Sequence, residues 1–319
     1  MATEPVATEP VATEPVATEP VATEPVAAVL AERGVLELSG PDVRPFLQGL
    51  LTNDLDRLTA GRAIWAALLT PQGRCLFDFA LVEDDGRVLL DGERARLAEL
   101  VRRLTLYRLR AAVELRDASA GWVVLALPGP AALARLGVPA ERGACRRDGE
   151  AILLVDPRLA ELGLRVLLPE GAVEGFLARH RLERAGAEPW DRHRLRLGVP
   201  DGSRDLVPEK ALALEANLLE LDAVSLSKGC FVGQELTARM AHRTLLRRRL
   251  LPVRVRGPLP APGTPVLAQG REQGEVRSGR DDRTLALLRL EALGAGPLDA
   301  GEARLEPDPP AWLAPALAD

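Results

Sequence analysis

The residues best suited to chemistry lie together in the segment 226–240. Its central run, Lys228-Gly229-Cys230-Phe231-Val232-Gly233-Gln234-Glu235, places a cation, a thiol, two glycines, an amide and a carboxylate just before a predicted helix over 233–240. Free amide donors at a helix start favour an anion, so this field and the ammonium of Lys228 are expected to favour the thiolate form of Cys230. On composition alone, a tight turn around a buried structural cysteine is the competing interpretation.

Two further polar pairs are open to two interpretations each. Asn53 and Asp54 follow an apolar stretch and could serve a site, but Asn and Asp also end helices and form turns, which is the favoured interpretation. Arg204 and Asp205 lie in a predicted loop and are equally ambiguous.

The cysteines and histidines show no metal-binding or disulfide pattern. Cys75, Cys145 and Cys230 lie far apart without C-x-x-C spacing, and the three histidines are equally scattered. We therefore predict no metal site, no disulfide framework and a reducing compartment. The N-terminus lacks a basic start followed by an apolar stretch, which argues against secretion. Together with the unpaired cysteines, this predicts a cytoplasmic protein. No apolar run approaches the ~20 residues that span a bilayer, so no membrane partner is expected.

The net charge of −5 comes from the N-terminal repeat. Residues 2–26 are five copies of Ala-Thr-Glu-Pro-Val and hold five of the 46 acidic residues, which leaves 41 acidic residues against 41 basic ones. A neutral body argues against nucleic acid as a partner. Proline at every fifth position removes amide donors from helix and sheet, so residues 1–27 are predicted to be a disordered tail.

The remaining elements predict an α+β protein of three domains. The N-terminal domain, 28–118, combines a helix over 43–48 (with Asp42 placed to cap it), a hairpin of strands at 63–69 and 74–82, and an amphipathic helix within 93–106. The middle domain, 119–245, has ferredoxin-like elements in the order strand, helix, strand, strand, helix, followed by helices over 189–197 and 209–221. Period-two alternation from Leu251 predicts a small antiparallel β-barrel over 246–310, with 311–319 as a tail.

Three stretches resemble one known family. The run 228–235 matches K-G-C-[FY]-x-G-Q-E, the signature of the YgfZ/GcvT-like folate-binding family, relatives of the glycine-cleavage T-protein. Phe46–Asp54 resembles the family's N-terminal helix and turn, and Arg204–Glu209 resembles the loop before its signature. The resemblance covers about residues 28–310.

The resemblance implies a GcvT-like three-domain ring around a central opening that binds tetrahydrofolate or a derivative. It also implies an accessory factor, not a classical enzyme, for assembly or repair of iron–sulfur clusters, with client or assembly proteins as partners and a link to tRNA modification. A folate site needs polar groups for the pterin edge, apolar walls and cations for the glutamate tail. We assign Cys230 as the reactive or cluster-contacting thiol, tuned by Lys228. The candidate folate-binding residues are Asn53, Asp54, Lys228, Gly229, Gln234, Glu235 and Arg239.

The alternative is a folate-dependent aminomethyltransferase of the T-protein type. T-proteins carry paired aspartates in a G-G-[VI]-x-D-D-like strand, whereas the run Gly73–Asp78 has Phe77 at one of the two positions. Asp91-Gly92-Glu93 stands where T-proteins have an Asn-rich turn. A folate-using demethylase or oxidoreductase is rejected, because no G-x-G-x-x-G follows a strand.

Overall fold

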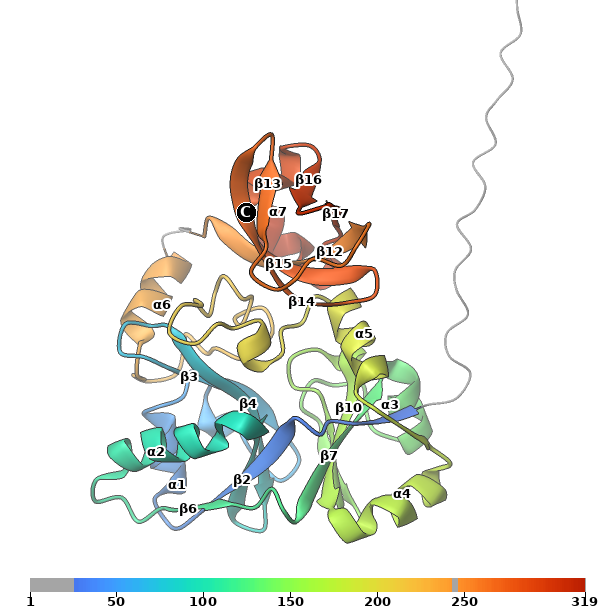
Figure 1. The fold of residues 1–319 in the computed structure, drawn as a ribbon. Helices are drawn as coiled ribbons and strands as arrows, with labels where there is room; N and C mark the ends of the chain where they lie inside the picture. Colours follow the sequence, from blue (N-terminus) through green and yellow to red (C-terminus); the bar gives the residue numbers. More distant parts are fainter. Residues whose placement is uncertain (1–25, 243–245, 319) are drawn as a thin grey trace, which may run out of the picture.

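The computed structural model describes residues 26–242 and 246–318, which form three bodies (Figure 1). Two sheet domains lie side by side, and the C-terminal barrel sits over both of them. Apart from residues 26 and 27, the predicted N-terminal tail lies outside the described residues. No helix among the described residues is long and apolar enough to cross a membrane.

The N-terminal domain is built on a five-stranded antiparallel sheet in the order β3-β4-β5-β2-β6. The predicted hairpin is confirmed, with β3 and β4 joined by a turn in which Gly73 has a positive φ. The predicted apolar face of α2 is confirmed too, because Leu97, Leu100 and Leu104 are buried against the sheet. The elements are β2 (Arg33–Ser39), α1 (Val43–Gln48), η1 (Leu55–Arg57), β3 (Ile64–Leu69), β4 (Cys75–Asp84), β5 (Arg87–Glu93), η2 (Arg94–Arg96), α2 (Leu97–Arg108) and β6 (Glu114–Asp117).

The middle domain contains a mixed six-stranded sheet in the order β11-β1-β7-β10-β9-β8. Its strand β1 comes from the start of the described chain and pairs in parallel with β11 and antiparallel with β7. Residues 26 and 27 therefore belong to this sheet, not to a tail as predicted, and residues 28 and 29 belong to it and not to the N-terminal domain. The elements are β1 (Val26–Val29), β7 (Trp122–Pro128), α3 (Pro130–Leu136), β8 (Cys145–Asp148), β9 (Ala151–Val155), η3 (Ala160–Leu162), β10 (Gly163–Pro169), η4 (Glu170–Ala172), α4 (Val173–His180), β11 (Glu183–Ala185), α5 (Glu188–Arg196) and η5 (Gly202–Arg204).

The C-terminal domain is the predicted barrel, closed in the order β12-β15-β14-β13-β16-β17. The predicted alternation of buried and exposed side chains is present at the end of β12, where Val253 and Val255 are buried and Arg254 and Arg256 are exposed. The elements are β12 (Arg248–Arg256), β13 (Pro265–Ala268), β14 (Arg271–Arg280), β15 (Arg283–Arg289), η6 (Leu290–Gly294), β16 (Leu298–Ala300), β17 (Ala303–Pro307), η7 (Ala311–Leu313) and α7 (Ala314–Ala318). The predicted C-terminal tail is therefore wrong for residues 311–318, because they form η7 and α7, and Leu313 is buried in the core of the barrel.

Two local predictions are wrong. Residues 209–221 form successive turns, not a helix, because Glu209 and Asn217 both adopt φ of +61°, which no helix accommodates. The apolar residues of this segment are nevertheless buried in the core between the domains. Asp42 makes no side-chain cap on α1; its carboxylate accepts a hydrogen bond from Ala112 N at 2.8 Å.

Candidate functional site

Lys228 anchors the signature segment to the end of α1. Its ammonium donates three hydrogen bonds to backbone carbonyls, of Gln48 at 2.7 Å, Leu51 at 2.7 Å and Asn53 at 2.8 Å. The last carbonyls of a helix have no partner inside it, so a cation there satisfies them and meets the negative end of the helix dipole. Lys228 is only 7% exposed, and this burial lowers its pKa to about 8. Lys228 thus positions the segment, and its side-chain hydrogen bonds within the described chain do not include Cys230.

Further bonds join the residues after α1 to those before Lys228. Thr52 Oγ1 donates to the carbonyl of Ala223 at 2.7 Å. The buried side-chain amide of Asn53 donates to the carbonyl of Asp222 at 2.7 Å. The two stretches of chain, far apart in sequence, are therefore fastened side by side.

Asp54 shapes the turn after α1. Its carboxylate accepts hydrogen bonds from Gln48 Nε2 at 2.9 Å and from the backbone N–H of Asp56 at 3.1 Å. The bond from Gln48 is the main reason that the pKa of Asp54 lies below its ordinary value. The contacts of Asn53 and Asp54 fit the turn interpretation of this pair.

Cys230 is the exposed member of the three cysteines, which excludes the buried-cysteine interpretation. The neighbouring Gly229 is exposed as well. Gly233 has a φ of +82°, and a Cβ on it would lie 2.5 Å from the carbonyl oxygen of Thr70. The segment is thus anchored at Lys228 and packed closely at Gly233, and the thiol between them faces solvent.

The remaining predicted ligands lie on or next to α6 (Gln234–His242). Glu235 and Arg239 form an ion pair one helical turn apart, with side chains 84% and 51% exposed. Gln234 is half-buried at the start of the helix. The structure brings together Asn53, Asp54 and Lys228, and it leaves Gly229, Cys230, Gln234, Glu235 and Arg239 on the solvent side of that anchor.

A separate cavity of about 320 Å³ lies where the three domains meet. Its wall includes the indole of Trp190 from α5, Asp201 and Arg204 from the loop before and within η5, and Arg280 from the barrel. None of the predicted folate-binding residues lines it. The lining residues are Leu30, Glu32, Arg33, Glu93, Ala187, Trp190, Asp191, Asp201, Gly202, Arg204 and Arg280.

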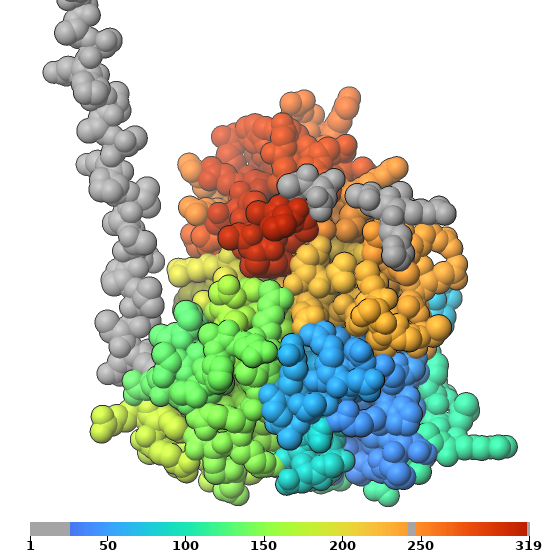
Figure 2. All heavy atoms as spheres, turned by 180° about the vertical axis from the view of Figure 1, so that it is seen from behind, coloured from blue at the N-terminus to red at the C-terminus, as the bar shows by residue number. Residues whose placement is uncertain are grey.

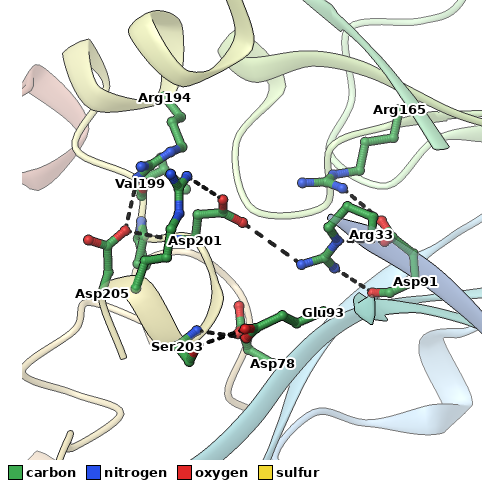
Figure 3. Close-up of polar contacts among 12 residues, drawn as sticks. Arg33, Asp78, Asp91, Glu93, Arg165, Arg194, Val199, Asp201, Ser203 and Asp205 are labelled. Carbon is green, nitrogen blue, oxygen red and sulfur yellow. Dashed lines mark hydrogen bonds and ion pairs between the residues drawn. The ribbon is translucent and has the colours of Figure 1, made fainter. Parts of the chain in front are cut away.

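A chain of buried ion pairs supports one side of this cavity (Figure 3). The carboxylate of Asp91 accepts hydrogen bonds from Arg33 Nε and from Arg165 Nη1, each at 2.7 Å. Arg165 also reaches Asp156 at 2.9 Å, as does Arg158. The chain is almost wholly buried, and such charges are tolerated only when they are paired. One donor of it, Arg165 Nη2, has no partner among the described residues.

A second group of charges joins α5, the loop 199–205 and the barrel. Arg194 donates to Asp205 at 2.9 Å and to Asp191 at 2.7 Å. Arg204 pairs with Asp191 and with Asp201, at 2.9 Å and 2.6 Å. The ambiguous pair Arg204 and Asp205 therefore belongs to the junction of the domains.

Asp78 of β4 lies in the same interior, and within residues 26–242 and 246–318 no arginine forms an ion pair with it. Its carboxylate accepts a hydrogen bond from Trp65 Nε1 at 3.2 Å. Burial raises its pKa to about 6, and the nearby charges of Arg33 and Arg158 offset that rise only in part.

Sequence reasoning missed the buried ion pairs as a group. Asp91 follows the apolar run 88–90, and Arg165 interrupts the apolar run 164–168. A charged residue inside an otherwise apolar strand was the sequence feature that could have predicted these ion pairs, because a buried charge needs a partner in the core. Among residues 26–242 and 246–318, no three His, Cys, Asp or Glu side chains are grouped to hold a metal ion.

Comparison with known proteins first defines the class. Residues 25–142 match the model of the GCVT N-terminal domain, and residues 247–315 match the C-terminal β-barrel domain of CAF17. The glycine cleavage system aminomethyltransferase T of Bartonella henselae has the same fold, with a TM-score of 0.73 and 18% identity over 91% of this chain and 86% of that chain. The chain is a GcvT-like α+β protein with a CAF17-type barrel.

Relatives with higher sequence identity define the family of this chain within that class. The human mitochondrial iron–sulfur cluster assembly factor IBA57 is 39% identical over 288 residues, which cover 83% of this chain and 78% of the human protein. The mouse protein of the same name is 35% identical over 286 residues, with the same coverage. This chain belongs to the IBA57 family.

The same relatives overturn the predicted cytoplasmic localisation, because they are named mitochondrial proteins. Unpaired cysteines indicate only that a compartment is reducing. Unpaired cysteines therefore do not distinguish the cytoplasm from another reducing compartment.

Proposed function

We propose that this chain is an iron–sulfur cluster assembly factor that presents Cys230 to its partner proteins. The observation that carries the proposal is an exposed thiol on a segment anchored by Lys228, in a chain 35–39% identical to named assembly factors over 83% of its length. Iron–sulfur clusters typically take about four protein ligands. Cys230 therefore supplies one contact to a cluster in transit, and thiols of the partner supply the others.

The thiol role is tested by Cys230→Ala, with Cys145→Ala as the matched control. Cys145 is half-buried, and Cys230 is exposed. In a strain that depends on the variant, Cys230→Ala should abolish the activity of iron–sulfur enzymes, whereas Cys145→Ala should retain it. An exposed side chain contributes within about 0.5 kcal/mol to stability, so purified Cys230→Ala should unfold like wild type. Normal iron–sulfur enzyme activity with Cys230→Ala would contradict the role.

We also propose that tetrahydrofolate or a derivative binds in the central cavity. The lining supplies the three kinds of group that such a ligand requires: apolar walls from Leu30 and Trp190, carboxylates from Glu93 and Asp201, and a cation from Arg204. A cavity of about 320 Å³ lies at the lower end of the usual range for small-molecule sites, about 300–1,000 Å³. In this arrangement the signature segment serves the thiol and not the folate.

Calorimetric titration with tetrahydrofolate under anaerobic conditions distinguishes the two candidate folate sites. Arg204→Met removes a cavity cation, yet Asp191 keeps Arg194 and Arg280 as partners, so the fold should survive. The double change Glu235→Ala, Arg239→Ala alters the end of the signature segment and the next turn of α6.

We expect one-site binding that weakens at least about tenfold, or 1.4 kcal/mol, in Arg204→Met and is unchanged in the double variant. The surface change Arg304→Met on the barrel is the control. Weakening only in the double variant would move the folate site to the signature segment. The absence of binding to wild type would remove folate from the proposal and leave the thiol role standing.

The alternative, an aminomethyltransferase, retains one favourable observation. Asp78 is a buried carboxyl with a pKa near 6, so it could exchange a proton near neutrality. The neighbouring Phe77 weakens this alternative, because its ring lies 4.3 Å from the guanidinium of Arg96 and provides no carboxylate. Transfer of the one-carbon unit of an aminomethyl donor to tetrahydrofolate by the purified chain, with release of ammonia, would establish it if Asp78→Asn abolished the transfer.

A further inference from the structure

The end of α2 carries the most exposed apolar side chains of the described chain. Leu106 is 72% exposed and Leu109 is 88% exposed, whereas the other exposed leucines, Leu259, Leu267 and Leu293, range from 37% to 41%. We call residues 102–110 the α2 tip. It ends in the chain segment that projects at the lower right of Figure 2. Large apolar side chains displayed together on a projection are typical of an interaction site.

The α2 tip is also basic. Arg102 and Arg110 are exposed, and neither has an ion-pair or hydrogen-bond partner within residues 26–242 and 246–318. Arg103 pairs with the exposed carboxylate of Glu209, at 3.2 Å. On a body with equal numbers of acidic and basic residues, the tip is a local excess of positive charge.

The backbone of the tip is held in place while its leucine points outward. Leu109 has φ of 47° and ψ of −105°, a sparsely populated combination for a branched side chain. The chain beyond it is fastened, because the carboxylate of Asp42 accepts the backbone N–H of Ala112 at 2.8 Å. Gly40 allows this approach, since a Cβ on it would lie 2.2 Å from the carbonyl oxygen of Ala112. Leu109 therefore lies between the end of α2 and a turn whose backbone is fastened.

Open surface adjoins both leucines. Leu106 lies with Val101 and Arg102 on the uncovered face of α2. Leu109 lies beside the turn at Gly40. Each leucine thus stands beside a space that side chains of a partner can enter.

We propose that the α2 tip is a docking surface for an acidic protein that receives Leu106 and Leu109 in apolar pockets and pairs its carboxylates with Arg102 and Arg110. Charge complementarity selects the acidic partner, and the two leucines act as central anchors within a charged rim. The surface is separate from the thiol and the cavity. It is expected whether or not the chain binds folate or serves iron–sulfur clusters.

A membrane and a nucleic acid can also bind a basic surface, but both fit the α2 tip less well than an acidic protein does. A helix that lies on a membrane inserts a whole apolar face, but the apolar face of α2, with Leu97, Leu100 and Leu104, is buried against its own sheet. A nucleic-acid surface uses exposed aromatic rings, and the only aromatic residue of the tip, Tyr107, packs on the domain core.

The test places a photo-crosslinking amino acid at position 106 of the full chain in its native host, and at position 259 on the barrel as control. We expect one discrete product that is specific to position 106 and contains a protein with an acidic surface. The purified pair should then bind at least about tenfold more weakly with Leu106→Ser, Leu109→Ser and with Arg102→Glu, Arg110→Glu. Binding should be unchanged with Leu259→Ser, Arg256→Glu, and it should weaken as salt rises from 0.1 to 0.5 M.

Four outcomes would overturn the proposal. Two concern crosslinking: products common to both positions, and a product that contains only a second copy of this chain. The third is a partner whose affinity is unchanged in the tip variants. The fourth is flotation of the chain with vesicles of 3:1 phosphatidylcholine and phosphatidylglycerol, if the tip variants abolish that flotation. Circular dichroism of each variant separates loss of docking from loss of fold.

Discussion

Asp78 allows a direct test of how the interior of the molecule is arranged. The change is Asp78→Asn, which keeps the shape of the side chain and an oxygen to accept the hydrogen bond from Trp65. Burial raises the pKa of Asp78 from 3.8 to about 6. Asp156 is the matched contrast in the same interior: burial alone would raise its pKa too, but the charges of Arg158 and Arg165 hold it well below the ordinary range.

The sign and size of the effect follow from proton linkage. Between pH 3.8 and about 6 the folded chain binds more protons at Asp78 than the unfolded chain does, so the contribution of Asp78 to stability falls as the pH rises through this window. Each tenfold difference in proton affinity corresponds to about 1.4 kcal/mol, so the ionised carboxylate destabilises the folded chain by about 3 kcal/mol at pH 7.

Asp78→Asn should therefore raise the free energy of unfolding by up to about 3 kcal/mol at pH 7.5 and change it little at pH 4. Asp156→Asn should lower it at pH 7.5 by about 3–5 kcal/mol, because it breaks a buried ion pair and leaves guanidinium charge uncompensated. Urea titrations at several pH values, followed by circular dichroism and tryptophan fluorescence, give both quantities. Destabilisation by Asp78→Asn at pH 7.5, or an equal gain at pH 4, would refute the reasoning.

Three further predictions concern the signature segment. Lys228→Met should lower the free energy of unfolding by about 2–4 kcal/mol in urea titrations, because three carbonyls, two of them in buried contacts, lose their donor; an unchanged value would show that water replaces the ammonium freely. Gly233→Ala should cost about 1–3 kcal/mol in the same titrations, since its φ of +82° disfavours any side chain; a neutral result would mean that the segment moves away. Iodoacetamide at pH 8 should alkylate Cys230 in the native chain, as followed by mass spectrometry. Cys75 and Cys145 should react only after unfolding, because burial raises the pKa of both of these thiols. Labelling of Cys75 before Cys230 would contradict the burial of Cys75.

Elements with a strong local period could be predicted from sequence, and elements defined by distant partners could not. The period of two in β12 and the apolar stripe of α2 each report one buried face, and both appear in the structure as expected. The spacing of leucines at 214, 218 and 221 imitates the same signal, yet these residues are buried by a series of turns. Strand β1 shows the other limit, because its partner β11 lies more than 150 residues further along the chain.

The candidate site divides in the same way. The signature segment is a local pattern, so its position before a helix could be read from the sequence. The ion pairs that support the cavity join β2, β5 and β10, and no local pattern connects Arg33 with Asp91 or Asp91 with Arg165. Only the presence of a charge within an apolar strand indicated that each needed a partner.

The contacts within the signature segment also indicate which of its residues are free to act. Lys228 binds carbonyls of the neighbouring stretch, Phe231 is buried, and Gly233 allows a close approach that a side chain would prevent. A motif of eight residues therefore does not require eight groups that act on a ligand or a partner. Cys230 is exposed and makes no hydrogen bond among the described residues, so its thiol is available to a partner. The other residues of the motif are better explained as the structure that holds this thiol in solvent at a defined place, as the proposed contact of Cys230 with a cluster requires.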